Sequence, residues 1–209
     1  MRDGPAKRVV GIVDYKAGNI QSIENAFTHV GATVLRVRSA SELESCTHVV
    51  LPGVGAFGFC AQRLSASGLT ESLRCWALTE QRPLLGICVG MQLLGDRSEE
   101  SPSAEGLGWI GGTIRRFPGG AGVRVPHVGW NTVRFERPFG TFDRGATADF
   151  YFDHSFAYHD PKAGETIGAC MHGVRFSAMV VAGNITAVQF HPEKSQSAGL
   201  KILSGFLSQ

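Results

Sequence analysis

The sequence lacks the patterns that mark several large classes of protein. No apolar run approaches the roughly 18 residues that a membrane-spanning helix requires. Basic residues are dispersed, the net charge is only +2, and no basic run is longer than two residues, as in Arg115-Arg116, which disfavours nucleic-acid binding. The segment from Met1 to Arg8 is polar, and Val9 to Val13 is too short for the apolar core of a signal peptide. We therefore expect a cytoplasmic protein without a membrane or nucleic-acid partner.

The five cysteines show no pairing pattern. Their number is odd, they are widely scattered and none belongs to a C-x-x-C pair, which disfavours both a disulfide framework and a zinc site. We expect no metal and no cofactor. Four of the cysteines are expected to be small buried hydrophobic residues in a reducing compartment, namely Cys46, Cys60, Cys75 and Cys170. Only Cys88 lies in a context that suggests chemistry.

The pattern of short apolar runs predicts an α/β fold. The chain has 209 residues, of which 43% are hydrophobic and 18% charged, and we expect a single domain over residues 1–209. Apolar runs at 7–14, 33–37, 48–51 and 83–87 alternate with segments of helical spacing. This alternation predicts a mostly parallel central sheet with helices on both faces. After Asp96 short β-prone runs prevail, among them 150–156, which predicts an antiparallel, β-rich second half.

Cys88 lies in the run Gly86-Ile87-Cys88-Val89-Gly90, between a predicted buried strand and a predicted helix. This is the pattern of a nucleophile elbow, in which flanking residues are small because backbones crowd around a strained turn. The N–H groups at the start of the helix would favour the thiolate and could hold the oxyanion of a tetrahedral intermediate. The alternative is a buried structural cysteine in a strand–turn–helix crossover.

His191 and Glu193 follow a predicted strand about a hundred residues later. We expect Pro192 to hold Glu193 in an extended relation to His191. A carboxylate bonded to one imidazole nitrogen leaves the other free to take a thiol proton, which is the logic of a catalytic triad. His191 could instead be a capped surface histidine and Glu193 a first-turn helix carboxylate. Their coincidence with the elbow favours the catalytic interpretation.

Both segments resemble the signature of the class I (triad) glutamine amidotransferases: Gly86-Ile87-Cys88-Val89-Gly90-Met91-Gln92 and Gln189-Phe190-His191-Pro192-Glu193-Lys194-Ser195. Within this family the chain is similar, nearly from end to end, to the glutaminase subunits of imidazole glycerol phosphate synthases. The narrower similarity depends on Pro52-Gly53-Val54-Gly55-Ala56-Phe57 and Val125-Pro126-His127-Val128-Gly129-Trp130-Asn131. The resemblance implies a flavodoxin-like fold and the hydrolysis of glutamine.

The resemblance also implies roles for individual residues. Cys88 would attack the side-chain carboxamide of glutamine to form a thioester, His191 would protonate the leaving ammonia, and Glu193 would orient His191. The segment Gly53, Val54 and Gly55 would supply an oxyanion N–H beside that of Val89, through a peptide rotation when a partner is loaded; an ordinary strand-to-helix turn is the alternative. Gln92 and Glu100 would hold the α-amino and α-carboxylate groups of glutamine, facing a wall made by His154, Ser155 and Phe156.

The partner implied by the resemblance is a (β/α)8-barrel cyclase, bound as a heterodimer. Ammonia would pass through the barrel to a ribonucleotide, and the products would be imidazole glycerol phosphate and aminoimidazole carboxamide ribonucleotide, in histidine biosynthesis. The residues expected to face the barrel are Asn19, Pro126, Trp130 and Lys194. Trp130 could equally be a core aromatic residue.

Several positions depart from the family pattern, including Lys16, Val89, Asp153, Phe156 and His172. These departures leave room for a paralogous glutaminase that supplies ammonia to another synthase, such as one that aminates a surface-polysaccharide sugar. A peptidase of the same superfamily is a further alternative, which the full-length similarity and Gln92 disfavour. A non-catalytic binding protein is another, which the intact triad disfavours.

Overall fold

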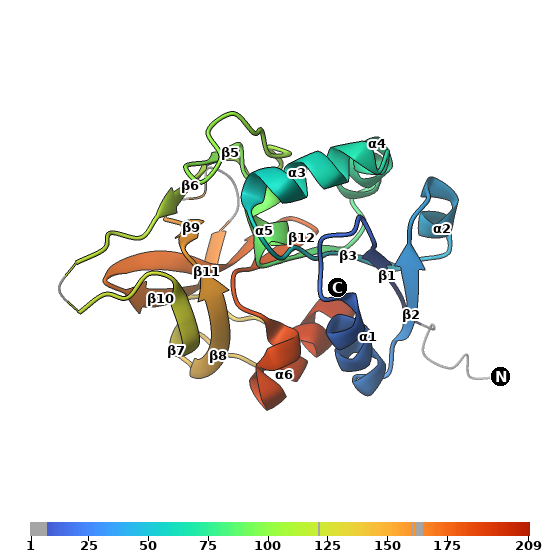
Figure 1. Ribbon diagram of the computed structural model, residues 1–209. Helices are drawn as coiled ribbons and strands as arrows, with labels where there is room; N and C mark the ends of the chain where they lie inside the picture. Colours follow the sequence, from blue (N-terminus) through green and yellow to red (C-terminus); the bar gives the residue numbers. More distant parts are fainter. Residues whose placement is uncertain (1–7, 121, 160, 162–164) are drawn as a thin grey trace.

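The computed structural model describes residues 8–120, 122–159, 161 and 165–209. Within these residues, nine strands form one continuous sheet in the order β2-β1-β3-β4-β12-β11-β10-β7-β8 (Figure 1). The strands from β2 to β12 pair in parallel, and those from β12 to β8 pair antiparallel. The parallel strands are β1 (Val9–Val13), β2 (Thr33–Val37), β3 (His48–Leu51), β4 (Leu84–Ile87) and β12 (Ile185–Val188).

The antiparallel strands are β11 (Val174–Ala182), β10 (Glu165–His172), β7 (His127–Phe135) and β8 (Thr147–His154). A second, three-stranded sheet contains β5 (Arg97–Ser98), β6 (Thr113–Arg116) and β9 (Phe156–Tyr158) in the described part of the chain. The predicted α/β fold with an antiparallel second half is therefore confirmed, and the two halves share one sheet.

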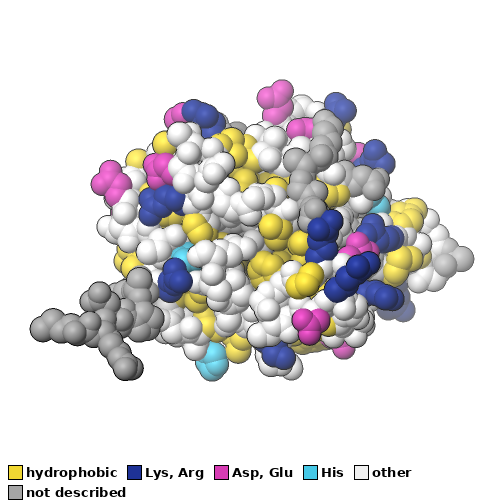
Figure 2. All heavy atoms as spheres, turned by 180° about the vertical axis from the view of Figure 1, so that it is seen from behind, with side chains coloured by type: hydrophobic (Ala, Val, Ile, Leu, Met, Phe, Trp, Pro, Cys, Tyr) yellow, Lys and Arg dark blue, Asp and Glu magenta, His cyan; other side chains and the backbone are white. Residues whose placement is uncertain are grey.

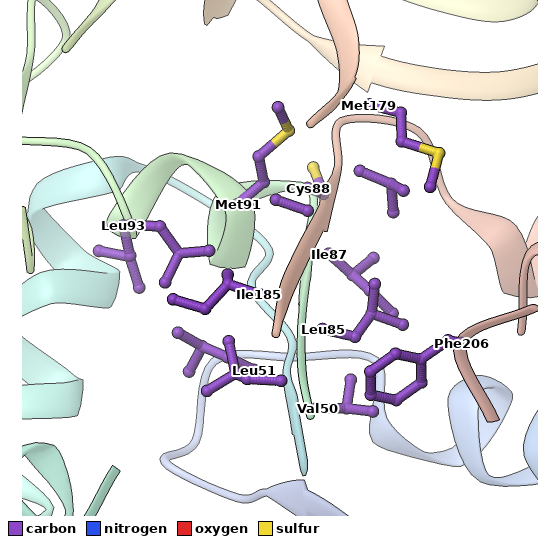
Figure 3. Packing of buried hydrophobic residues seen from close by; sticks show 14 of the residues in the cluster. Val50, Leu51, Leu85, Ile87, Cys88, Met91, Leu93, Met179, Ile185 and Phe206 are labelled. Carbon is purple, nitrogen blue, oxygen red and sulfur yellow. The ribbon is translucent and has the colours of Figure 1, made fainter. Parts of the chain in front are cut away.

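Helices cover both faces of the parallel half (Figure 1). On one face α1 (Ile20–His29) packs against α6 (Gln196–Leu207), and on the other α3 (Phe57–Ala66) packs against α5 (Val89–Leu93). Figure 3 shows Leu93 of α5 and Phe206 of α6 on opposite sides of the strands, and both side chains are buried. The remaining helical segments are α2 (Ala40–Glu44), α4 (Thr70–Arg74), a π-helical turn (Cys75–Thr79) and a 3-10 turn, η2 (Pro192–Lys194).

Several predicted boundaries shift in the structure. The single strand predicted over 150–156 is wrong, because Ser155 separates β8 from β9 and these strands belong to different sheets. At this break the carbonyl oxygen of Ser155 accepts a hydrogen bond from the backbone N–H of Phe117 at 3.1 Å. Lys7, the first residue of the predicted strand at 7–14, lies outside the described residues. That residues 1–209 form a single domain stays a prediction.

Most charged side chains lie on the surface. Figure 2 shows lysine and arginine side chains gathered over the antiparallel half on the rear face, with acidic side chains among them. In this half Arg175 donates to both carboxylate oxygens of Glu136 at 2.8 Å. Such exposed pairs contribute little to stability, but they neutralise part of the positive charge. In the described part of the chain no helix combines the length and apolar character needed to cross a bilayer.

Candidate active site

Cys88 occupies the turn between β4 and α5, with φ 54° and ψ −113°. A positive φ is rare for a residue with a β-carbon and is found mostly where the surrounding structure imposes it. The chain is closely packed around this turn: a β-carbon on Gly90 would overlap the carbonyl oxygen of Leu51 on neighbouring β3. Figure 3 shows Cys88 at the end of the strand that carries Leu85 and Ile87. The predicted strained turn is therefore present, and Cys88 is only 3% exposed.

His191 and Glu193 lie against Cys88. His191 Nδ1 and Glu193 Oε1 are 2.8 Å apart, and the imidazole and the Cys88 thiol line the same cavity. Both side chains are buried, with 4% and 1% of their surfaces exposed. Burial disfavours the imidazolium, but the hydrogen bonds and charges of Cys88 and Glu193 outweigh it and raise the pKa of His191 to about 10. The arrangement is that of a thiol, an imidazole and an orienting carboxylate in series.

The expected extended relation between His191 and Glu193 is wrong. His191 itself is extended, with φ −97° and ψ 96°, but Pro192 begins the 3-10 turn η2 and Glu193 lies within it. Proline is favoured in the first position of a helical turn, because its fixed φ suits the helix and its missing N–H leaves no unpaired donor. It is this turn, and not an extended segment, that brings the Glu193 carboxylate within 2.8 Å of the His191 imidazole.

A cavity of about 260 Å³ opens above Cys88. Most residues expected to bind substrate line it, together with Cys88, His191, Asp153 and two of the expected partner-facing residues. The expected residues in its lining are Val54, Gly55, Val89, Gln92, Glu100, Pro126, His154, Ser155, Phe156 and Lys194. Gly53, Glu193, Asn19 and Trp130 are absent from the lining. The volume is slightly below the range of roughly 300–1,000 Å³ that is usual for small-molecule sites, as suits a ligand as small as an amino acid.

The segment expected to form an oxyanion hole is closed in this conformation. The backbone N–H of Val89 donates to the carbonyl oxygen of Gly53 at 3.3 Å. The carbonyls on either side of Gly53 are also held: Tyr15 Oη donates to Pro52 O at 2.5 Å, and Cys60 Sγ donates to Val54 O at 3.4 Å. Gly55, with φ 99°, lies in a region that favours glycine.

Gln92 faces the cavity from α5 with a defined amide orientation. Its Nε2 donates both hydrogens, to Phe156 O at 2.9 Å and to Gln189 Oε1 at 3.0 Å. Among the described residues no hydrogen bond reaches Gln92 Oε1, which remains an acceptor for a ligand. Glu100 adds a carboxylate, fixed through Oε2 by the backbone N–H of Phe57 at 2.7 Å.

The wall formed by His154 is uncharged. Its Nδ1 carries a proton because it lies 2.9 Å from Phe156 O, which can only accept, and its Nε2 lies 3.0 Å from His127 Nδ1. Burial lowers the pKa of His154 to about 3 and that of His127 to about 4. His172, one of the departures from the family pattern, stacks on His127 with ring centroids 4.0 Å apart.

The residues expected to face a partner lie on the surface. Trp130 is 50% exposed, so it is not a core aromatic residue, and its ring meets that of Tyr151 edge-on at 6.2 Å. Lys194 Nζ lies 5.4 Å from the same Tyr151 ring. Asn19 is exposed at the start of α1, where its side chain donates to Ser22 Oγ at 3.0 Å.

Four residues near the site were not predicted to take part in it: Tyr15, Cys60, His127 and Gln189. Cys60 is buried, as expected of a small hydrophobic residue, but its thiol also fixes Val54. Of the other three cysteines expected to be buried, Cys75 is only partly buried. The one available signal for Gln189 was its position two residues before His191, in the same short segment that follows a predicted strand.

Comparisons with known proteins follow this geometry. Residues 11–209 match the family described as Glutamine amidotransferase class-I. The chain is 40% identical over 203 residues to imidazole glycerol phosphate synthase subunit HisH of Bdellovibrio bacteriovorus, covering 95% of this chain and 98% of the relative. It is also 40% identical over 199 residues to the subunit of the same name from Methanothermobacter thermautotrophicus, with 95% and 98% covered.

A plant relative is longer. The chain is 40% identical over 201 residues to imidazole glycerol phosphate synthase hisHF, chloroplastic, of Arabidopsis thaliana, and covers 34% of that protein. Among solved structures, a glutamine amidotransferase crystal structure aligns with a TM-score of 0.75 at 18% identity, covering 96% of this chain and 99% of that one. PurLQS from Thermotoga maritima aligns with a TM-score of 0.75 at 17% identity, covering 97% and 98%. At these identities the structural likeness shows the fold alone.

Proposed function

Because the chain belongs to the class-I glutamine amidotransferase family, we propose that it is the glutaminase subunit of an imidazole glycerol phosphate synthase. It hydrolyses glutamine to glutamate and ammonia and passes the ammonia to a cyclase subunit, which makes imidazole glycerol phosphate and aminoimidazole carboxamide ribonucleotide in histidine biosynthesis. The observation that carries the proposal is the meeting of Cys88 with the hydrogen-bonded pair of His191 and Glu193, at a cavity of amino-acid size that both Cys88 and His191 line.

The proposed reaction has two half-reactions. The Cys88 thiolate attacks the side-chain carboxamide carbon of glutamine, and the tetrahedral intermediate collapses as the His191 imidazolium gives its proton to the leaving ammonia. The C–N bond breaks and a γ-glutamyl thioester remains. His191, now neutral, takes a proton from water as the water attacks the thioester, and glutamate leaves with restoration of the thiolate–imidazolium pair. Glu193 keeps the imidazole oriented throughout.

Substrate recognition is assigned to the cavity walls. Gln92 Oε1 is an acceptor without a protein partner in the described chain, and Glu100 offers a carboxylate on the same cavity. Both suit the α-ammonium group of glutamine, since ammonium can only donate. The contact between Phe156 and Gln92 uses the Phe156 backbone carbonyl, so phenylalanine in place of the more usual tyrosine leaves it intact. This departure therefore gives no support to the paralogous glutaminase.

We assign the closed oxyanion hole to the resting state. Rotation of the Gly53–Val54 peptide would release the Val89 N–H and turn the Val54 N–H toward the same space, giving two donors for the oxyanion. Binding of the ligand-loaded cyclase would favour the rotated state. Donors preorganised in this way stabilise charge that develops only in the transition state, so a closed hole predicts weak activity of the chain alone.

The proposed partner is a (β/α)8-barrel cyclase subunit, bound over the mouth of the cavity. Pro126 and Lys194 line the cavity itself, and Trp130 is an exposed aromatic residue next to the Tyr151 and Lys194 pair. Exposed tryptophans are frequent binding hot spots. This chain covers only 34% of the plant relative, and that longer protein is named as the synthase rather than as one of its subunits. We also propose a cytoplasmic location, which the free state of all five cysteines supports.

The direct test is glutamate release from glutamine by the purified chain, with and without a cyclase subunit carrying its ribonucleotide ligand. We expect strong stimulation by the loaded cyclase, and loss of all activity in Cys88→Ala, which keeps the fold but lacks the nucleophile. A folded, thiol-reactive protein that no cyclase stimulates would overturn the histidine-pathway assignment and direct the search to another ammonia acceptor.

A further inference from the structure

Gln189 has a buried side-chain amide that contacts both the nucleophile Cys88 and the cavity residue Gln92. It is 0% exposed, its Nε2 lies 3.7 Å from Cys88 Sγ, and its Oε1 accepts from Gln92 Nε2 at 3.0 Å. Its backbone N–H donates to Ala178 O at 2.9 Å, so the main chain is held against β11 just past the end of β12. Gln189 and His191 lie two residues apart in the bend that follows β12, and the side chains of both reach Cys88 from this one segment.

The backbone carbonyl of Phe156 fixes the orientation of the side-chain amides of Gln92 and Gln189. Phe156 O can only accept, so the atom of Gln92 that faces it must be the nitrogen. The second hydrogen of that nitrogen points to Gln189, which must then present its oxygen. The remaining end of the Gln189 amide, which faces Cys88 Sγ, is consequently an N–H donor. The order Phe156, Gln92, Gln189, Cys88 admits no other orientation of the two amides.

We propose that Gln189 is a positioning residue with two functions at once: it donates a hydrogen bond to the Cys88 thiolate, and it holds Gln92 with Oε1 toward the substrate. The inference rests on the proposed glutaminase function. His191 supplies the proton, while Gln189 supplies a neutral donor on the sulfur that stays in place when the imidazolium has given its proton away. A donor bonded to an anion stabilises it more than a donor bonded to a neutral group, so the thiolate form gains.

The two functions predict different behaviour in two substitutions. Gln189→Met fills similar space but offers neither donor nor acceptor, so Cys88 loses its donor and Gln92 loses the acceptor that orients it. Gln189→Glu keeps an acceptor for Gln92 Nε2 but turns an oxygen toward the sulfur. The matched control is Thr186→Val on β12, three residues before Gln189. Thr186 is also 0% exposed, and its hydroxyl bonds only the side chain of Gln209 in the described structure.

Two measurements separate these effects. The first is the rate at which iodoacetamide alkylates Cys88 at neutral pH in the complete chain, with mass spectrometry to identify the labelled cysteine. The second is kcat and KM for glutamine in the complex with the ligand-loaded cyclase. We expect both Gln189 variants to slow alkylation by roughly tenfold, as befits loss of a hydrogen bond to an anion. KM should rise by roughly tenfold in Gln189→Met and change little in Gln189→Glu. We expect kcat to fall in both of these variants. In Thr186→Val, KM and kcat should both stay as in the wild type.

Equal alkylation rates in the wild type and a folded Gln189→Met protein would overturn the donor function. A KM that rises equally in both variants, or in Thr186→Val, would overturn the orienting function. If Gln189→Met does not fold, Gln189→Glu and its alkylation rate decide the donor function. Absence of glutaminase activity in the wild-type complex would refute the proposed function instead, and the alkylation rates would still test the contact between Gln189 and Cys88.

Discussion

Val89 and Gly53 are joined by a backbone hydrogen bond of 3.3 Å, in which the amide expected to hold an oxyanion donates to a protein carbonyl. The bond links the end of β3 to the turn that carries Cys88. Tyr15 and Cys60 hold the carbonyls before and after Gly53, so that the Gly53–Val54 peptide can rotate while the groups on either side stay in place. The nucleophile is thus assembled in a structure whose oxyanion hole is closed.

This closure predicts that partner binding stimulates hydrolysis without activating the thiol. Hydrolysis of glutamine passes through a tetrahedral oxyanion, whereas alkylation by iodoacetamide displaces iodide in one step and forms none. The ligand-loaded cyclase should therefore raise kcat for glutamine by roughly 100-fold or more, the usual effect of an oxyanion donor. The alkylation rate of Cys88 should not rise. A parallel rise of both rates would show that the partner acts on the thiol instead.

The raised pKa of His191 predicts a loss of stability at alkaline pH. Its value of about 10 in the folded chain lies above the ordinary 6.5. Hence the stabilising contribution is fully present below pH 6.5 and is lost as pH rises through about 10. Glu193→Gln removes the charge that helps to raise this pKa, so the wild type should exceed the variant in unfolding free energy by about 2 kcal/mol near neutral pH. Urea unfolding of both proteins between pH 7 and pH 10.5 should show this difference shrinking.

The same substitution should affect catalysis. A glutamine at position 193 can still accept from His191 Nδ1 but cannot balance the imidazolium charge, so kcat should fall by roughly 100-fold or more while KM changes little. An unfolding difference that stays constant up to pH 10.5 would contradict the raised pKa of His191, and an unchanged kcat would contradict the role of Glu193.

The parts of the site that sequence could predict are those encoded within one short segment. The elbow around Cys88 is such a part, because crowding at a strand-to-helix turn demands glycine at fixed spacing. The Pro192 turn was mispredicted, since proline is compatible with both an extended segment and the first position of a helical turn. Gln189 was missed because its function depends on donors and acceptors from three segments far apart in the chain. The joining of the parallel and antiparallel halves into one sheet was also not predicted, because it depends on contacts between segments far apart in the chain.

Close packing at Gly90 predicts a severe effect from one methyl group. A β-carbon there would overlap Leu51 O, a backbone atom that cannot move without displacing β3. Gly90→Ala should lower the unfolding free energy by more than about 2 kcal/mol and abolish the reactivity of Cys88. Gly119→Ala is the control, because nothing lies within 4 Å of its β-carbon position. Equal urea midpoints for the two variants would contradict the packing described for the elbow.

A buried histidine away from the cavity predicts sensitivity to acid. His48 is 1% exposed, and burial together with the charge of Arg8 lowers its pKa to about 4. Because the unfolded chain binds a proton below pH 6.5 and the folded chain does not, stability is lost as pH falls from 6.5 toward 4. His48→Leu removes the group that takes up this proton. Between pH 7 and pH 5 the variant should therefore lose about 2 kcal/mol less unfolding free energy than the wild type. Identical losses in urea titrations would contradict the low pKa.

Trp130 offers a test of the partner surface that leaves the active site untouched. Its ring is half exposed and contacts Tyr151, so truncation removes little from the fold. At the centre of an interface, however, a buried tryptophan commonly contributes 2 kcal/mol or more. Trp130→Ala should therefore weaken binding of the cyclase subunit by roughly 30-fold in calorimetry, with the alkylation rate of Cys88 unchanged. Leu35→Ala is the control, since Leu35 is an exposed apolar residue on β2, at the opposite end of the nine-stranded sheet. Equal affinities for the two variants would place the partner on another face of the molecule.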